Sequence, residues 1–336
     1  MAPAADAAKY AADLSDGPLV FTRGTLIYVS QRLVLIVFTV LAVSSIVFLG
    51  IHRLPGDALF SEHLHGDAYQ NLLHHYGLDQ PLQTQYWNYV VGVVTRGDLG
   101  ESLVNRGIKI TPVVIRELGV SVTVGLLALV FTIGLGLVLG VFAAVRQNTW
   151  VDYLLTTTSV IGYSMPNFVI ASLLILVFGI WLQNVTQGAF FYQLGTWTGG
   201  IDQLWLPAFA LGFPYASIVA RLTRASMLEV IRQDYVRTAR AKGLRESVIM
   251  VRHALRNALI PVITILGPLI MGIITGGVVI ENIFGIPGLG KEFAQSILNR
   301  DYAIVIGVFT MYAALVGLAN LAVDLAYVVI DPRIRY

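Results

Sequence analysis

The sequence contains no cysteine, so disulfide bonds, thiolate metal sites and cysteine nucleophiles are all excluded. Charged residues are also scarce, at 12% of the 336 residues, about half the fraction typical of soluble domains. Neither HExxH nor GxSxG occurs, so an intramembrane metalloprotease or serine protease lacks its main signature. Residues 1–26 have no apolar core of the signal-peptide kind, and they predict a flexible cytoplasmic tail.

Apolar residues make up 56% of the chain, and they predict an all-α integral membrane protein. Six apolar segments reach or approach the length that crosses a bilayer. Lys and Arg concentrate between alternate segments, which places both termini in the cytoplasm by the positive-inside rule. The predicted spans are residues 33–51, 118–145, 156–182, 205–220, 258–280 and 303–330.

Polar residues interrupt the third predicted span at Ser164, Pro166 and Asn167. Such residues are tolerated at membrane depth where they face protein or a water-lined path. The sequence leaves two interpretations open: a packing kink, or part of a translocation path.

Residues 221–257 form the most basic stretch of the chain, with nine Lys or Arg residues between Arg221 and Arg256. Burying them in lipid would cost about 3 kcal/mol each, so this stretch lies outside the bilayer on the cytoplasmic side. Met227, Ile231 and Tyr235 recur at helical spacing, together with Leu228, Thr238 and Ala239. Gly243 then predicts a break before a second short helix over residues 245–256. An ordinary basic loop that only sets topology is the alternative.

Two other polar regions, residues 52–117 and 281–302, are predicted to be extracytoplasmic. The first contains five histidines and several acids, and either a metal site or a solvated loop explains them. The second contains GIPGLGK at residues 285–291, which matches all but the last position of a phosphate-binding loop. Glu292 stands where Ser or Thr is needed, and a membrane helix precedes the motif, so nucleotide binding is rejected.

The second external region is also too apolar for a slack linker, and it predicts a structured segment. Pro287 and Gly288 indicate a turn, and Phe293, Ile297 and Leu298 predict one buried side of a short helix over residues 291–299. This segment is interpreted as a gate over the external mouth; a helix that only packs on the outer rim is the alternative.

Asp324 lies inside the sixth apolar segment, about two turns from its cytoplasmic end. An acid at membrane depth is a functional candidate. We expect a structural pair with a basic residue near residues 221–257 rather than a proton relay.

Several motifs resemble one family in the same order. YVRTARAKGL at residues 235–244, followed by RHALRNALIPV, resembles the cytoplasmic coupling loop of ABC-importer permeases, in the version of the dipeptide, oligopeptide and nickel permeases. RLPGD at 53–57, YGLDQPL at 76–82, RGDLGES at 96–102 and IFGIPGLG at 283–290 are similar to the same family. The resemblance covers residues 27–336 and implies a six-helix transmembrane domain of the type I ABC-importer fold.

The resemblance also implies site residues. The coupling motif is Glu-Ala-Ala, three residues, then Gly; here the Glu is absent. The implied ATPase-coupling residues are Arg237, Thr238, Ala239, Arg240, Lys242, Gly243 and Leu244. The implied gate residues are Phe284, Pro287, Gly288, Leu289 and Gly290.

By the same resemblance, the chain would be a permease subunit in a bacterial inner membrane, without enzymatic activity of its own. Its partners would be a second homologous permease, two ATPase subunits, an extracytoplasmic solute-binding protein and membrane lipid, but no nucleic acid. ATP and Mg²⁺ would bind to the ATPase subunits, and this chain would carry no cofactor. Short peptides are the expected substrate, with nickel or another small solute as the alternative. A proton-coupled secondary transporter and a membrane enzyme are the rival classes.

Overall fold

The structure is a computed structural model that describes residues 23–53, 67–187 and 200–330. Within these parts of the chain it contains helices and no β-strand. Six of the described helices are long and apolar enough to cross a membrane: Leu26–Ile51, Ile110–Val145, Asn167–Val185, Trp205–Val230, Ile260–Phe284 and Tyr302–Ala326. The predicted all-α class and the number of spans are therefore confirmed.

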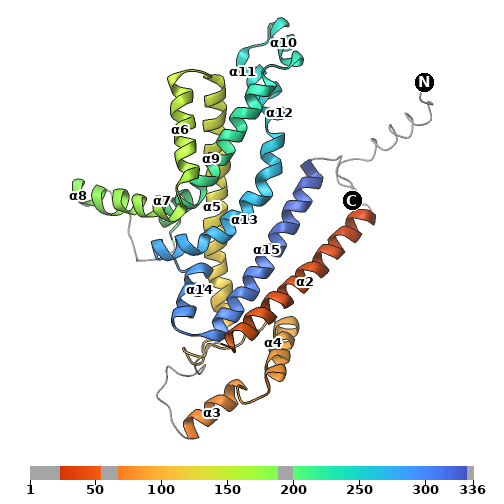
Figure 1. The fold of residues 1–336 in the computed structure, drawn as a ribbon, viewed down its shortest axis with the longest axis vertical. Coiled ribbons are helices and arrows are strands. Elements are labelled where there is room, and N and C mark those ends of the chain that lie inside the picture. The colour runs from red at the N-terminus through yellow and green to blue at the C-terminus, as the bar shows by residue number, and fades with distance from the viewer. Residues whose placement is uncertain (1–22, 54–66, 188–199, 331–336) are drawn as a thin grey trace, which may run out of the picture.

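Shorter helices connect the spans, and Figure 1 shows the arrangement. The first half of the chain contains α2 (Arg23–Ile51), α3 (Asp67–Tyr76), α4 (Leu82–Arg96), α5 (Ile110–Val145), α6 (Trp150–Ser164), α7 (Asn167–Leu174), a π-helix (Ile175–Trp181) and α8 (Leu182–Val185). The second half contains a 3₁₀ turn (Ile201–Gln203), α9 (Trp205–Val230), α10 (Asp234–Ala241), α11 (Glu246–Val248), a π-helix (Ile249–Leu255), α12 (Arg256–Ala258), α13 (Ile260–Phe284), α14 (Leu289–Leu298) and α15 (Tyr302–Ile330).

Helix α5 has 36 residues and extends from the turn before α6 to the level of α14 (Figure 1). At 1.5 Å per residue it is about 54 Å long, more than the roughly 30 Å of a bilayer core. Its first turns pack in one cluster with Leu289 and Ile304, whereas Ala144 near its end packs with Met227 and Ala254. Helices α14 and α10 therefore lie near opposite ends of the molecule.

Glycines bring α5 and α9 into close contact. A Cβ atom at Gly136 would lie 2.6 Å from the Cβ of Val219, and one at Gly140 would lie 2.5 Å from the Ala220 carbonyl oxygen. From the other side, the Thr132 hydroxyl donates a buried hydrogen bond of 3.0 Å to the Gly212 carbonyl. Small residues allow such close approach of backbones inside a membrane. This pair of helices forms the core on which α6, α7 and α13 pack.

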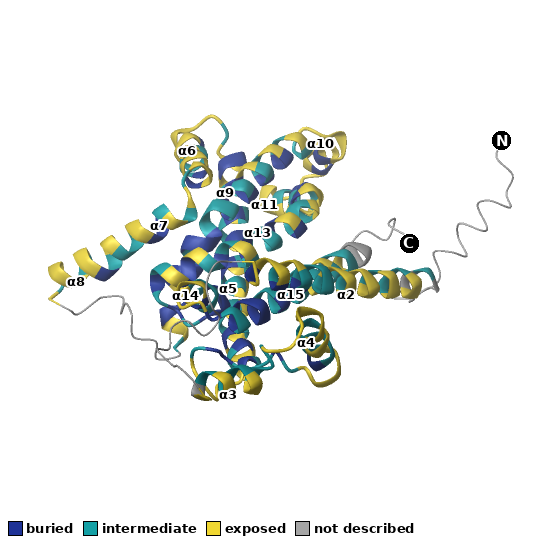
Figure 2. Cartoon of the chain, turned by 60° about the horizontal axis from the view of Figure 1, so that its bottom comes forward, coloured by how far each residue is buried: buried dark blue, intermediate teal, exposed yellow. Residues whose placement is uncertain are grey.

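Helices α2 and α15 form a second, antiparallel pair beside this core. Tyr28 near the start of α2 contacts Asp324 near the end of α15, while Phe48 packs on Val305. The outer surface of α2 is strongly exposed and apolar (Figure 2), with Phe38 68% exposed, as is expected of a surface that faces lipid.

Several helices extend beyond the predicted spans. Helix α2 begins ten residues earlier than predicted, so residues 23–26 of the expected flexible tail are helical; residues 1–22 lie outside the described parts. Helix α5 begins at residue 110 instead of 118. Helix α9 ends at residue 230 instead of 220, and α13 ends at residue 284 instead of 280. The apolar segments mark only the part of each helix that lipid can surround, and the helices continue where water or protein covers their polar turns.

The third predicted span was wrong as a single helix. The chain leaves helical geometry at Met165, which is extended (φ −87°, ψ 129°), and α7 starts anew after Pro166. Figure 1 shows α7 and α8 turning away from the direction of α6. Pro166 lacks an N–H and disfavours helix at the residue before it, so the break follows from local chemistry.

The glycine contacts predict a difference between two neighbouring positions. Gly136→Ala would place a methyl group against Val219, and we expect a loss of about 1–3 kcal/mol of stability from overpacking. Gly134→Ala is the matched control, because a Cβ there meets no atom of the described chain within 4 Å. Thermal unfolding of the purified protein in detergent would measure both. Equal midpoints for the two variants would contradict the packing argument.

Candidate coupling and gating sites

The foot, residues 234–255, projects beyond α9 at one end of the molecule (Figure 1). Helix α10 ends in a Schellman motif: the Gly243 N–H donates to the Arg240 carbonyl at 2.9 Å, and the Leu244 N–H reaches the Ala239 carbonyl at 3.4 Å. Gly243 has φ +75°, which an L side chain rarely adopts. The predicted glycine break is confirmed.

A small core holds the foot together. Val236, Ala239 and Ile249 are buried against one another, although the foot lies outside the main bundle. The apolar pattern predicted from sequence is right through Ile231 and again at Ala239. It is wrong at Tyr235, which is 42% exposed, and at Thr238, which is exposed as well. The chain turns between α9 and α10, which changes the side that is buried, and Val236 takes the place assigned to Tyr235.

The remaining coupling candidates form an exposed, basic surface. Ala239 is buried, and the exposed members are Arg237, Thr238, Arg240, Lys242, Gly243 and Leu244. Arg240 pairs with Glu246 at 2.7 Å, which ties α10 to α11 and lowers the pKa of that carboxyl. The predicted second helix is present as α11, a π-helix and α12 in succession. Arg221 and Arg224 belong to α9 rather than to the foot.

The gate segment, residues 281–302, lies at the other end. Helix α13 continues through Phe284, and Gly285 caps it with φ +71°. Of the gate candidates, Phe284, Gly288, Leu289 and Gly290 are buried, and Pro287 is half-buried. The predicted buried side of the short helix was wrong in part: Phe293 packs inward, but Ile297 is 49% and Leu298 is 81% exposed. Helix α14 is anchored by its first turns, so its last turn faces outward.

A buried carboxylate explains the phosphate-loop lookalike. Glu281, 1% exposed, accepts the Gly290 N–H at 2.7 Å at the start of α14. A Cβ at Gly288 would lie 2.5 Å from the Glu281 carboxyl carbon, and one at Gly290 would lie 2.3 Å from the Cα of Val278. Helix N-termini commonly bind anions, and here the bound anion is the carboxylate of Glu281 from the same chain. Lys291 reaches the Gly285 carbonyl at 3.0 Å.

A second carboxylate fixes the end of the gate segment. Asp301, 2% exposed, accepts hydrogen bonds from the Ser102 hydroxyl and from the Leu103 N–H at 3.2 Å. Ser102 is the last residue of RGDLGES, whose Gly97 and Gly100 both have positive φ. These glycines turn the chain after α4, and Asp301 fastens this turn to the start of α15.

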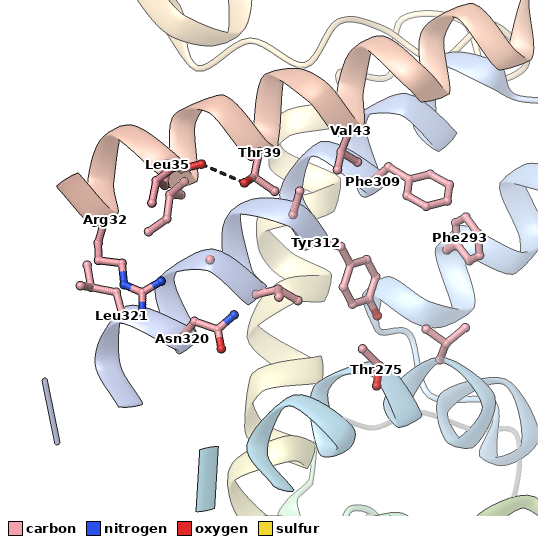
Figure 3. Close-up of a pocket in the computed structure, with 15 residues that line it drawn as sticks. Arg32, Leu35, Thr39, Val43, Thr275, Phe293, Phe309, Tyr312, Asn320 and Leu321 are labelled. Carbon is pink, nitrogen blue, oxygen red and sulfur yellow. Dashed lines mark hydrogen bonds between the residues drawn. The ribbon is translucent and has the colours of Figure 1, made fainter. Parts of the chain in front are cut away.

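The three path candidates lie at the break between α6 and α7. Ser164 and Pro166 are exposed, and Asn167 is half-buried and faces Gly276 of α13. The helix is interrupted here, and a role of these residues in a translocation path stays a prediction. These residues do not line the cavity shown in Figure 3, which has a volume of about 530 Å³ and lies between α2, α13 and α15. In Figure 3, Tyr312 and Asn320 extend from α15 toward the cavity, whose lining is mainly apolar.

Asp324 has a structural partner, although not the one expected. Its carboxylate lies 2.8 Å from Arg32 Nη2 and accepts a hydrogen bond of 2.9 Å from the Tyr28 hydroxyl. Both partners come from α2 rather than from the neighbourhood of the foot. The prediction of a structural ion pair at Asp324 is confirmed, but the predicted location of its basic partner was wrong.

The histidine-rich region gives no metal site within the described residues, where no group of three or more potential ligands converges. His74 pairs with Asp79 at 2.9 Å, and His75 lies 3.6 Å from Glu101. His63 and His65 fall outside the parts that the structure describes.

The sequence analysis did not identify three buried acids that hold helices together: Asp152, Glu281 and Asp301. Asp152 at the start of α6 binds Arg224 of α9, 72 positions away, so no local pattern marked it. Glu281 had a usable signal: an acid in the last turn of an apolar helix, directly before a Gly-rich turn.

Six apolar spans with a structured foot at one end define a multi-pass membrane protein. Comparison with known proteins identifies the family. The family described as "Binding-protein-dependent transport system inner membrane component" matches residues 136–336, and "Binding-prot-dependent transport system membrane comp, N-term" matches residues 25–105. The chain belongs to this family and is a multi-pass inner membrane protein. The predicted ABC-permease membership is confirmed.

Three relatives cover nearly the whole chain. The dipeptide transport system permease protein DppB of Bacillus subtilis is 41% identical over 309 residues, 92% of this chain and 97% of that protein. The oligopeptide transport system permease proteins OppB of Haemophilus influenzae and Salmonella typhimurium are 37% and 38% identical over 311 residues, 92% of this chain and 99% of each. A crystal structure of an amino acid ABC transporter with histidines covers 67% of this chain and 95% of its own, at 16% identity and a TM-score of 0.46.

The Glu281 contact predicts a specific effect of Gly290→Ala. The added methyl group would meet the α13 backbone, so we expect α14 to shift and Glu281 to lose its N–H donor, at about 1–3 kcal/mol. Gly277→Ala is the control, because its Cβ would make only an ordinary contact of 3.6 Å.

Ser296→Cys reports the shift, since Ser296 is 2% exposed and the chain has no other cysteine. We expect a membrane-impermeant maleimide to label this cysteine rapidly in Gly290→Ala and slowly in Gly277→Ala. Slow labelling in both would show that α14 tolerates the methyl group.

Proposed function

We propose that this chain is a permease subunit of an ATP-driven importer of short peptides. The observation that carries the proposal is the foot: a rigid, basic, exposed element with a core of its own, at the end of the molecule opposite the gate segment. The named relatives belong to dipeptide and oligopeptide transport systems, and they align with 92% of this chain. Together these features suit a subunit that is moved from one end and opens at the other.

In this proposal the foot docks into a cleft of an ATPase subunit, and ATP and Mg²⁺ bind there rather than to this chain. Arg237 and Lys242 offer cationic groups for that contact, while Gly243 sets the angle between α10 and α11. A second, homologous permease completes the pathway, and two ATPase subunits move the two feet. An extracytoplasmic binding protein delivers the peptide at the end where α3, α4 and α14 lie.

Residues 281–302 act as the external gate in this proposal. The Glu281 contact joins the gate helix α14 to the spanning helix α13, so movement of α13 is transmitted to the mouth. The Gly290→Ala variant bears on this as well: uptake should fall if α14 gates the mouth, and should persist if α14 only packs on the rim.

The charge pair at Asp324 weighs against a proton-coupled transporter. Its carboxylate is engaged by Arg32 and Tyr28, which leaves it a structural role. An intramembrane acid that carries protons would need to exchange them with water along the path.

Uptake by cells tests the function. In a host that lacks its own copy of this chain, we expect loss of labelled di- and tripeptide uptake and recovery when the chain is restored. Uptake should stop when ATP is depleted, and it should persist when a protonophore collapses the proton gradient at maintained ATP. Recovery of Ni²⁺ uptake without peptide uptake would contradict the proposed substrate, and sensitivity to the protonophore alone would contradict the class.

Gly243→Pro tests the coupling role. Proline fixes φ near −65° and has no N–H, so neither the φ of +75° nor the bond to the Arg240 carbonyl could form. We expect peptide uptake to fall to background at an unchanged level of the protein in the membrane. Gly107→Pro is the control, with φ +76° and equally open surroundings in the described chain, but at the opposite end. Normal uptake by Gly243→Pro would refute the role of the foot.

A further inference from the structure

Asp152 and Arg224 form a bidentate ion pair between α6 and α9. Arg224 Nε lies 2.6 Å from Asp152 Oδ1, and Nη2 lies 2.7 Å from Oδ2. Asp152 is only 2% exposed and also accepts the Asn148 N–H at 3.0 Å and the Thr156 hydroxyl at 3.2 Å. The carboxylate is therefore saturated with donors and fixes the turn before α6 to the helix beside it.

The ion pair stays charged at neutral pH. The hydrogen bond from Arg224 holds the pKa of Asp152 at about 2, although burial acts in the opposite direction. Because the folded-state pKa lies below the ordinary value, the attachment is complete above that value and weakens only as pH falls toward 2. The contact is a permanent fastening rather than a pH-dependent switch.

Helix α6 is fastened to α9 a second time near its other end. A Cβ at Gly162 would lie 2.3 Å from the Ser217 hydroxyl oxygen and 2.7 Å from the Phe213 ring. Beside this second attachment, the guanidinium of Arg221 lies 5.3 Å from the centre of the Tyr163 ring, in a cation–π contact. A rod held at both ends cannot pivot on α9.

Helix α9 also carries the foot. Arg224 lies ten positions before Asp234, where α10 begins. Met227, between them, packs on Ala144 at the end of α5 and on Ala254 in the foot. A displacement of the foot is therefore passed to α9 and, through Arg224 and Asp152, to α6.

The rigid connection ends where α6 ends. Met165 is extended, Pro166 provides no N–H, and α7 leaves in another direction (Figure 1). Ser164 and Pro166 are exposed, whereas Met165 between them packs against the main core. The junction is the first point along this route at which the helical backbone is interrupted, and a bend there would displace α7, whose buried Ile170 and Ala171 pack in the main core.

We propose that Asp152 and Arg224 are positioning residues that make α6, α9 and the foot one rigid body, which hinges on α7 at Met165–Pro166. This inference rests on the proposed coupling role of the foot. It adds a route: movement imposed on the foot reaches the α6–α7 junction instead of being lost between α6 and α9.

Distances between spin labels test the rigid body directly, and the cysteine-free chain allows labels at chosen sites. Thr157→Cys on α6, Ser172→Cys on α7 and Ser247→Cys in the foot are all at exposed positions. The assembled transporter, with its partner subunits in lipid nanodiscs, would be measured without nucleotide and with ATP trapped. We expect the 157–247 distance to stay constant and the 172–247 distance to shift.

Two variants then test the ion pair. Asp152→Asn keeps the shape but removes the charge, and Arg224→Lys keeps the charge but cannot bind in bidentate fashion. We expect a broader 157–247 distribution that moves on ATP trapping, and a several-fold fall in substrate transported per ATP hydrolysed, more severe in Asp152→Asn. Asp324→Asn is the matched control: it removes a helix–helix ion pair between α2 and α15, and it should leave the 157–247 distance unchanged.

Three results would overturn the inference. The first is a 157–247 distance that shifts with ATP in the unmodified chain. The second is a 172–247 distance that does not. The third is an Asp152→Asn protein with lower thermal stability but the same label distances and the same transport per ATP, which would make the pair structural only. Failure of the proposed function would be detected separately, by the peptide-uptake assay and by the uptake of the Gly243→Pro variant.

Discussion

The close contact between α5 and α9 is the constraint on which the rest of the structure depends. Gly136, Gly140 and Gly212 remove the side chains that would hold the two helices apart. Lipid tails are as apolar as the side chains, so helices in a membrane associate through tight packing and hydrogen bonds rather than through the hydrophobic effect. Accordingly, 61% of the most apolar stretch of α9 is buried, against 17% for α2.

Carboxylates, all but Asp324 fully buried, then fasten the other elements to this core. Asp152 joins α6 to α9, Glu281 joins α14 to α13, Asp301 joins the turn after α4 to α15, and Asp324 joins α15 to α2. Removing one partner of a buried charge pair typically costs about 3–5 kcal/mol, because the other partner is left uncompensated. A chain with few charged residues thus uses several of its acids to hold helices together.

The two ends of the molecule are built in similar ways. Each has a short helix set by a glycine with positive φ, Gly243 at the foot and Gly285 at the gate, and each helix is held by its own buried contacts. The long helix α5 extends from the cluster at one end to the cluster at the other. Stiff ends joined by long helices suit a protein in which a displacement at one end must become an opening at the other.

The sequence by itself determined the all-α membrane class, the number of spans, the glycine break in the foot and the turn before α14. Each of these follows from chemistry within a few residues: apolar length, charge that lipid cannot accept, a φ that only glycine adopts readily, and the missing N–H of proline. Local chemistry was not enough for the buried side of α10, where Tyr235 was chosen and Val236 is the residue inside, or for the partner of Asp324. Only the tertiary structure decided those, together with the pairing of Asp152 and Arg224 across 72 positions. A helical pattern shows which residues share one face of a helix. Which element packs on that face depends on where helices distant in sequence lie.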